Sequence, residues 1–225
     1  MRRIVSHGPP SFSHEFKLRD EGFIAIAGID EAGRGAWAGP VHAACVILPI
    51  TDHCVAQLAL VNDSKQLSPN QRDHCRTAII QAARAIGEGS ASSTEIDQLG
   101  IVPATRLAMR RAVEALPIPA DALVIDAVRL PSLQQRQDVF FFADAISLSV
   151  AAASIIAKTS RDRQMLELDL AYPGYGFAKH KGYGTQLHRT ALGVLGVTEV
   201  HRKSYAPIKQ CSSIFVASPD KLHST

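Results

Sequence analysis

The stretch AGIDEAGRGAWAGPV, residues 27–41, places two adjacent carboxylates, Asp30 and Glu31, in an otherwise apolar run. A β-type segment precedes the acids and another follows, so the pattern predicts two strands joined by a short antiparallel connection. Burying an unpaired carboxylate is costly, so such acids are usually paired, hydrogen-bonded, bound to a metal or placed at a strand end. The glycines that follow permit the bend needed to bring both carboxylates to one site.

The composition is that of an ordinary globular protein, with 225 residues of which 46% are hydrophobic and 20% charged. The net charge of +3 is too small to indicate a nucleic-acid partner by itself, so any basic surface must be local. No apolar run approaches the roughly 18 residues of a membrane span, and the N-terminus lacks a signal-peptide core. The four cysteines show no paired spacing, which favours free thiols in the cytoplasm.

Periodicity predicts five strands and at least five helices in one catalytic domain, residues 21–210, between a loose leader at 1–20 and a tail at 211–225. The strands are expected at 22–32, 39–49, 86–92, 121–128 and 138–145. The helices are expected at 67–86, 93–99, 103–116 and 147–172, and from about residue 185. Ser68 and Pro69 are a typical helix start, and Gly100 a typical stop. This order predicts an α/β fold with a mixed central sheet flanked by helices.

Four acids each interrupt a strand-like or helix-entry apolar run: Asp30, Glu31, Asp126 and Asp144. A capping or strand-end role explains any single one of them equally well. For the four together, one shared cation site is a simpler explanation than four separate structural roles. Oxygen-only ligands suit hard cations such as Mg²⁺ or Mn²⁺.

Two other patterns are weaker. Residues 33–38, GRGAWA, fit the outline of a dinucleotide-binding turn, but Gly39-Pro40 and a β-type segment follow where that turn needs a helix. The tripeptide Asp-His-Cys occurs at 52–54 and 73–75 without the spacing of zinc ligands, which favours chance repetition.

The segment GFAKHKGYG, residues 176–184, interleaves basic groups with aromatic rings, which suits contact with a nucleic-acid backbone. A solvated loop is an equally good interpretation of this segment alone. The last third of the chain is locally basic, as expected of a nucleic-acid enzyme; the further basic residues are His188, Arg189, His201, Arg202 and Lys203.

Seven motifs that together span about residues 25–209 resemble bacterial ribonuclease HII in sequence and in order. They are GIDEAGRG, NDSKQLS, EIDQLGI, VIDAVRLP, SLSVAAASIIAKTSRD, YPGYGFAKHKGYGT and TEVHRKSYAPIK. The resemblance implies a ribonuclease H-like fold and metal-assisted endonucleolytic cleavage of the RNA strand of RNA–DNA hybrids. It also implies nicking on the 5′ side of single ribonucleotides in duplex DNA, leaving 5′-phosphate and 3′-hydroxyl ends. A catalytically impaired hybrid-binding protein of the same fold is the alternative.

The resemblance also implies roles for individual residues. Catalysis and the binding of Mn²⁺ or Mg²⁺ fall to the same four acids: Asp30, Glu31, Asp126 and Asp144. Substrate binding falls to Gly33, Arg34 and Gly35 at the ribose 2′-hydroxyl, to Tyr183 at the following sugar, and to Lys65 and Lys181 at phosphates.

The chain departs from the family pattern next to two of the acids. Ala127 follows Asp126 where glycine is usual, and Phe142-Ala143 precedes Asp144 where Lys-Gly is usual. We expect a monomer with no membrane association. A sliding clamp is a possible partner for this family, but residues 212–225 contain no convincing docking motif.

Overall fold

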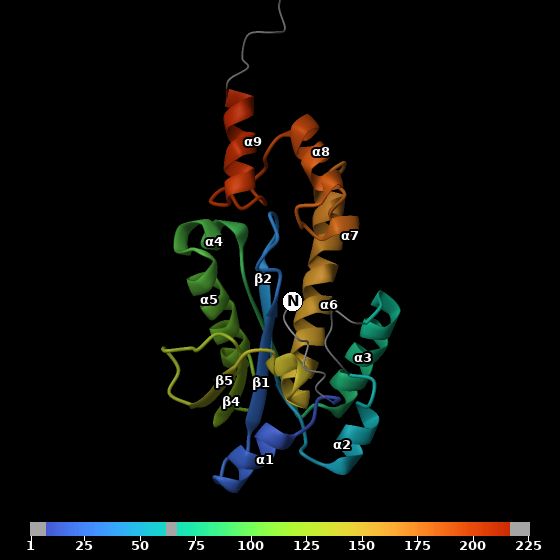
Figure 1. Cartoon of the computed structure of the whole chain (residues 1–225), viewed down its shortest axis with the longest axis vertical. Helices are drawn as coiled ribbons and strands as arrows, with labels where there is room; N and C mark the ends of the chain where they lie inside the picture. Colours follow the sequence, from blue (N-terminus) through green and yellow to red (C-terminus); the bar gives the residue numbers. More distant parts are fainter. Residues whose placement is uncertain (1–7, 62–66, 217–225) are drawn as a thin grey trace, which may run out of the picture. The chain divides into compact units, whose positions relative to one another are not determined.

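The computed structural model describes residues 8–61 and 67–216 of the chain (Figure 1). The five strands are β1 (Ile26–Ala32), β2 (Val41–Ile47), β3 (Ala85–Ala91), β4 (Ala122–Asp126) and β5 (Arg136–Phe140). The helices are α1 (Ser13–Asp20), α2 (Asp52–Gln57), α3 (Pro69–Ala82), α4 (Ser93–Leu99), α5 (Ile101–Glu114), α6 (Leu148–Ala171), α7 (Phe177–His180), α8 (Gln186–Leu195) and α9 (Ala206–Val216), with a 3₁₀ turn η1 at Ala143–Ala145. Lys65 and the segment 217–225 lie outside the described residues.

The strands form one mixed sheet in the order β3-β2-β1-β4-β5. The β1–β2 pair is antiparallel, with Ala27 opposite Ile47, as the short connection predicts. β1 and β4 are parallel, and so are β4 and β5. The predicted class, a mixed sheet with flanking helices, is therefore confirmed.

Contacts within the chain group it into two compact units. The first contains residues 1–32, 42–90 and 105–160, and the second contains 33–41, 91–104 and 161–225. The strand framework belongs almost wholly to the first unit, and most of the C-terminal third belongs to the second. No shift of composition marks the division, which explains why the sequence gives no sign of it.

The core of the first unit depends on the small residues at the start of α6. Ala151, Ala152 and Ile156 are fully buried in a cluster that also holds Val46 of β2 and Ile79 of α3. Figure 1 shows α3 and this part of α6 to one side of β1 and β2, with α5 to the other. α6 approaches β1 so closely that a Cβ on Gly28 would lie 2.2 Å from the carbonyl carbon of Ser149, so glycine is required there.

The second unit has its own apolar cluster, built from sequence-distant segments. Its buried members include Met165 of α6, Tyr175, Phe177 of α7, Leu192 of α8 and Ile208 of α9. Each such side chain contributes about 1.5–3 kcal/mol when fully buried. The cluster therefore stabilises the glycine-rich basic segment that follows α6.

Three local predictions are wrong. Residues 13–20 of the expected leader form α1, because Leu18 is fully buried and the carboxylate of Glu15 accepts a 2.6 Å hydrogen bond from the Ser147 hydroxyl. Residues 211–216 of the expected tail continue α9. The expected strand at 138–145 ends at Phe140 and is followed by η1. Within the described part of the chain, no helix is long and apolar enough to cross a membrane.

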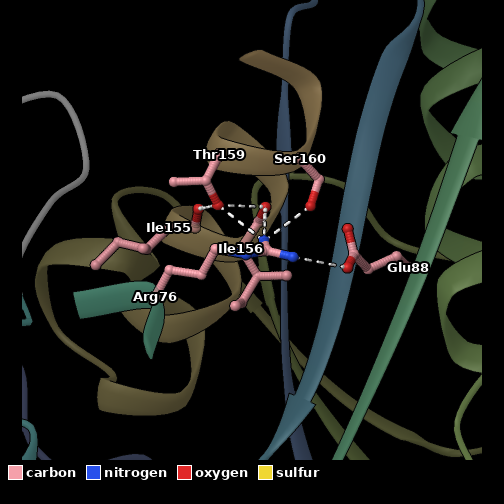
Figure 2. A network of polar contacts seen from close by, with 6 residues as sticks. All are labelled: Arg76, Glu88, Ile155, Ile156, Thr159 and Ser160. Atoms are coloured by element: carbon pink, nitrogen blue, oxygen red, sulfur yellow. Dashed lines mark hydrogen bonds and ion pairs between the residues drawn. The ribbon is translucent and has the colours of Figure 1, made fainter. Parts of the chain in front are cut away.

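Arg76 on α3 ties together three elements of the first unit (Figure 2). One guanidinium nitrogen, Nη1, donates to the carbonyl of Ile156 at 3.3 Å and to the hydroxyls of Thr159 and Ser160 at 2.9 and 2.8 Å, all on α6. The other, Nη2, lies 3.4 Å from Glu88 of β3. Only 11% of the Arg76 side chain is exposed, so these contacts are largely shielded from water.

Replacing Arg76 with Met keeps most of the aliphatic stem and removes the guanidinium. Because charge-assisted hydrogen bonds in a shielded site are worth about 1.5–3 kcal/mol, we expect the free energy of unfolding in urea to fall by that amount. The matched control is Arg110→Met, which removes an exposed ion pair with Glu114 on α5 and should cost less than about 0.5 kcal/mol. Equal losses for the two variants would contradict this account.

Candidate active site

The first two acids lie at the end of β1 that adjoins β4. Parallel pairing runs to Ile29 opposite Ile125, so Asp30 and Asp126 are the next residues along their strands. The carboxyl ends of parallel strands meet at one edge of a sheet, which brings Asp30 and Asp126 together. Asp30 is only 5% exposed, and Glu31 and Asp126 are half-buried.

Asp144 reaches the same edge through the turn after β5, not through a strand. The Asp126 carboxylate accepts a 2.9 Å hydrogen bond from the backbone N–H of Ala143, the first residue of η1. The backbone N–H of Ala127 in turn donates to the carbonyl of Phe140 at 3.0 Å. These bonds hold η1 next to the end of β4, and Asp144 is 5% exposed.

Asp30 lies close enough to the other three acids to feel the charge of each. Burial raises the pKa of Asp30 well above its ordinary value, and the charges of Glu31, Asp126 and Asp144 raise it further, in that order. The backbone N–H of Glu31, which donates to the Asp30 carboxylate at 2.7 Å, opposes the shift. The structure thus brings together all four acids that the sequence predicts.

The donor set and the charge of this site fit a hard divalent cation, because all four side chains offer carboxylate oxygens. The side chains do not form a preassembled ligand group, however. Across residues 8–61 and 67–216, no three His, Cys, Asp or Glu side chains are placed to hold one ion together. Bringing a cation between the acids would therefore require their side chains to move.

Two residues beside these acids adopt left-handed backbone conformations. Ala127 has a φ of 56° and Phe142 a φ of 62°, which costs a non-glycine residue roughly 1–2 kcal/mol. A glycine at position 127 would adopt this conformation without the cost of a Cβ. Phe141 and Phe142 are 74% and 70% exposed, so neither ring is held by packing.

In the second unit, buried Arg202 holds the segment that contains Gly33, Arg34 and Gly35. Its Nη2 and Nη1 donate to the carbonyls of Gly33 and Arg34, each at 2.7 Å, and its Nε donates to the carbonyl of Gly39 at 3.0 Å. Burial lowers the pKa of Arg202 from its ordinary value. The guanidinium fixes three peptide planes of this segment.

Arg161 joins the same segment to the loop that carries Tyr183. Its Nε donates to the carbonyl of Pro40 at 3.0 Å, its Nη2 donates to the carbonyl of Lys181 at 2.9 Å, and its guanidinium carbon lies 5.3 Å from the Tyr183 ring centroid. Burial lowers the pKa of Arg161 to about 10, so the group stays charged at neutral pH. Gly33 has a φ of 95°, and a Cβ there would lie 1.9 Å from the Arg161 Nε.

The predicted substrate residues Gly33, Arg34, Gly35, Lys181 and Tyr183 all belong to the second unit. Lys181 donates from Nζ to the carbonyl of Ala178 at 2.7 Å. A Cβ on Gly35 would meet nothing within 4 Å, so space does not require glycine there.

The predicted basic surface is smaller than the sequence indicates. His188, His201 and Arg202 are fully buried, and only Arg189 and Lys203 of that group are exposed. Arg161 and Arg202 are the positioning residues that sequence reasoning missed, because basic residues without an apolar pattern around them read as surface. Arg161 lies in TSRD and Arg202 in HRKSYAP, motifs that carry the family resemblance, and this was the one available signal.

Comparison with known proteins agrees with this geometry. The ribonuclease HII family model matches residues 27–208. The ribonuclease HII of Chloroflexus aggregans is 50% identical over 200 residues, which cover 88% of this chain and 94% of that protein. The crystal structure of ribonuclease H2 from Pyrococcus horikoshii OT3 matches with a TM-score of 0.72 at 24% identity, over 87% of this chain and 100% of that one. That of Bst-RNase HIII in complex with Mn²⁺ matches with a TM-score of 0.65 at 20% identity, over 95% and 76%.

The mixed sheet has the fold of the solved ribonuclease H2 and HIII structures, and the family match makes the chain a ribonuclease H-type hydrolase. The family match is more specific than the fold. The chain belongs to the ribonuclease HII family.

Replacing Ala127 with Gly should stabilise the protein, because glycine adopts a φ of 56° without a Cβ clash. We expect the free energy of unfolding to rise by about 0.5–1 kcal/mol in chemical denaturation. Ala56→Gly on α2, at an exposed helical position, should lower it by a similar amount. The explanation fails if both substitutions change stability in the same direction.

Arg202→Lys tests the hold on Gly33 and Arg34. A single ammonium cannot replace a planar fork that reaches three carbonyls, so kcat/KM on an RNA–DNA hybrid should fall by about tenfold or more. Circular dichroism at the assay temperature verifies that the variant is folded. Arg110→Lys on α5, which keeps a positive charge beside Glu114 at an exposed position, should stay within about twofold of the parent protein. Similar rates for both variants would contradict the assignment.

Proposed function

We propose how this chain, an endoribonuclease that acts on RNA–DNA hybrids, cuts its substrate: Asp30, Glu31, Asp126 and Asp144 form the catalytic site. The carrying observation is the raised pKa of Asp30, caused by burial and by the charges of the other three acids. A fold gains no stability from gathering four carboxylates around one buried position, so function is the better explanation.

The four acids would hold Mg²⁺ or Mn²⁺. A bound divalent cation supplies activation of the attacking water and neutralises charge on the leaving oxygen. The residues of the chain supply the rest: the ends of β1 and β4 fix Asp30 and Asp126, and the bond from Ala143 to Asp126 fixes the turn that presents Asp144. The products would carry 5′-phosphate and 3′-hydroxyl ends.

Recognition of RNA falls to the second unit in this proposal. The backbone of Gly33, Arg34 and Gly35 contacts the ribose 2′-hydroxyl, the group that distinguishes RNA from DNA. Support comes from the two 2.7 Å bonds that fix the carbonyls of Gly33 and Arg34 on Arg202. Tyr183 packs on the next sugar, which makes a single ribonucleotide in duplex DNA a substrate, nicked on its 5′ side. Lys181 and Lys65 contact phosphates.

No observation favours a catalytically impaired hybrid-binding protein. Ala127 replaces the usual glycine, yet its backbone adopts a φ of 56°, and Asp144 lies close enough to raise the pKa of Asp30. We further propose that the enzyme acts as a monomer in the cytoplasm, on ribonucleotides left in DNA by replication.

The test uses a labelled DNA duplex with one ribonucleotide, incubated with Mg²⁺, Mn²⁺ or a chelator. We expect the parent protein to nick 5′ of the ribonucleotide only with metal. Asp144→Asn should cut at least about a hundredfold more slowly, because it loses one cation-binding charge. The control Asp73→Asn, an exposed acid on α3, should cut at the parent rate.

Three results would contradict the proposal. Cutting in chelator would exclude the cation, and an unchanged rate for Asp144→Asn would remove that acid from the site. Binding of the duplex by the parent protein without cutting in either metal would restore the impaired-binder alternative.

A further inference from the structure

Three histidines lie together in the interior of the second unit. His188 of α8 and His201 are fully buried, and His180 of α7 is nearly so. The rings of His180 and His188 stack with centroids 4.4 Å apart, and those of His188 and His201 are 5.3 Å apart. Neither the acid cluster nor the two buried arginines accounts for this group.

The proton on His201 is fixed by its neighbours. Its Nδ1 lies 3.0 Å from the backbone nitrogen of Thr198, whose N–H must donate. A ring nitrogen that accepts is unprotonated, so a neutral His201 carries its proton on Nε2. That atom lies 3.1 Å from the Nε2 of His188, and the bond therefore runs from His201 to His188.

His188 accepts the bond from His201 and donates a second hydrogen bond, to the backbone of Tyr183. Its Nδ1 lies 3.1 Å from the carbonyl oxygen of Tyr183, which can only accept. His188 thus carries its proton on Nδ1 and accepts from His201 on Nε2. The result is a directional series of hydrogen bonds from the Thr198 N–H through two rings to the Tyr183 carbonyl, which we name the histidine relay.

His180 binds the backbone of Gly182, the residue before Tyr183. Its Nε2 lies 2.8 Å from the Tyr175 carbonyl and so donates, while its Nδ1 accepts from the N–H of Gly182 at 3.2 Å. Gly182 and Tyr183 are therefore gripped at a backbone N–H and at a carbonyl by two stacked rings, His180 and His188.

The relay requires neutral rings, and its surroundings keep them neutral. Burial lowers the pKa of both His188 and His201 to about 4, with neighbouring histidines as a further cause. His180 faces both rings, and Lys203 also disfavours a charge on His201. The remaining rings packed on the pair are Trp37, Tyr175 and Phe177, which carry no charge at neutral pH.

We propose that His188 and His201 are positioning residues for the cleavage reaction, which act through the histidine relay to hold the Tyr183 backbone so that its ring meets the substrate sugar. This inference rests on the proposed function, which assigns Tyr183 to the sugar. The relay touches no substrate itself. Its effect belongs to substrate binding more than to the chemical step.

Two amide variants, each of which mimics one nitrogen of the His188 ring, distinguish loss of the bond to Tyr183 from loss of packing. His188→Asn places an amide near the Nδ1 position and keeps the donor to the Tyr183 carbonyl. His188→Gln reaches the Nε2 position, keeps an acceptor for His201 and gives up the bond to Tyr183. Both lose the ring, and thermal unfolding of each variant measures the accompanying loss of stability, against which the KM values are compared.

We expect His188→Gln to raise KM for the single-ribonucleotide duplex about tenfold with kcat within about twofold, and His188→Asn to raise KM by less than about threefold. In a Tyr183→Ala background, His188→Gln should have no further effect on KM, because the relay acts through that ring. Equal KM values for the two variants, or a full additional effect in the Tyr183→Ala background, would overturn the proposal.

A readout independent of cleavage is the tautomer of each ring, measured by ¹⁵N NMR of the full-length protein at neutral pH. We expect His188 in the Nδ1–H form and His201 in the Nε2–H form. An Nε2–H form for His188 would overturn the relay even if the enzyme cuts normally. Failure of the parent protein to cut the duplex, with both tautomers as expected, would instead overturn the proposed function and with it the role in substrate binding.

The pH dependence of stability provides a third measurement. An unfolded histidine titrates near pH 6.5 and these two near 4 in the folded chain, so the unfolded state takes up protons first as the pH falls. Their contribution to stability is complete above about pH 6.5 and is lost progressively toward about pH 4. His188→Asn removes one of the two groups and should make this decline shallower. An unchanged slope would contradict the burial of a neutral His188.

Discussion

The parallel pairing of β1 and β4 is the interaction on which the acid cluster of the first unit depends, and repulsion among the carboxylates around buried Asp30 is its cost. Parallel pairing of β1 and β4 forces Asp30 and Asp126 to the same sheet edge, and the bond from Ala143 to Asp126 brings Asp144 there as well. Each of these contacts adds negative charge to a shielded place, as the raised pKa of Asp30 records. The left-handed conformation of Ala127 adds a further cost, because the chain makes a tight turn directly after Asp126, with the Val128 N–H donating to the Asp126 carbonyl at 2.6 Å. A divalent cation held by the proposed catalytic acids would offset this repulsion.

The second unit uses buried charge of the opposite sign, and it compensates that charge differently. Arg161 and Arg202 are fully buried, and both bond to backbone carbonyls of residues 33–40. Carbonyls satisfy the N–H donors of a guanidinium without cancelling its charge. Arg161 remains protonated at neutral pH because its burial-lowered pKa is still about 10, and burial also lowers the pKa of Arg202 from its ordinary value. A positive charge in the interior would suit the second unit's proposed role of meeting a polyanionic strand, and the modest net charge of +3 does not reveal it.

The sequence predicted those features that depend on local pattern. The β1–β2 hairpin, the helix start at Ser68 and all four acids followed from apolar runs, caps and the cost of burying charge. The predicted path of the chain to Asp144 was wrong. A run of phenylalanines has the apolar pattern of a strand, but β5 ends at Phe140 and the next turn bonds to Asp126, a distant contact that local pattern does not reveal. The helix at 13–20 was missed because its stability comes from contacts of Glu15 and Leu18 with distant segments. His188, His201 and Arg202 were predicted to lie in a basic surface and Arg161 was not singled out, since nothing local distinguishes a solvated basic residue from a buried one.

The buried arginines and histidines position the backbone of the residues proposed to contact the ribose and the next sugar. The segment at Gly33, Arg34 and Gly35 is defined less by its own side chains than by the groups that hold its backbone. Gly33 must be glycine because of the Arg161 Nε, whereas Gly35 has open space around the position of a Cβ. Tyr183 is held in the same way, by rings that bond to its carbonyl and to the N–H of Gly182. Under the proposed function, selectivity for RNA would therefore depend on buried arginines and neutral histidines many residues away in sequence, which hold the backbone of the proposed contact residues.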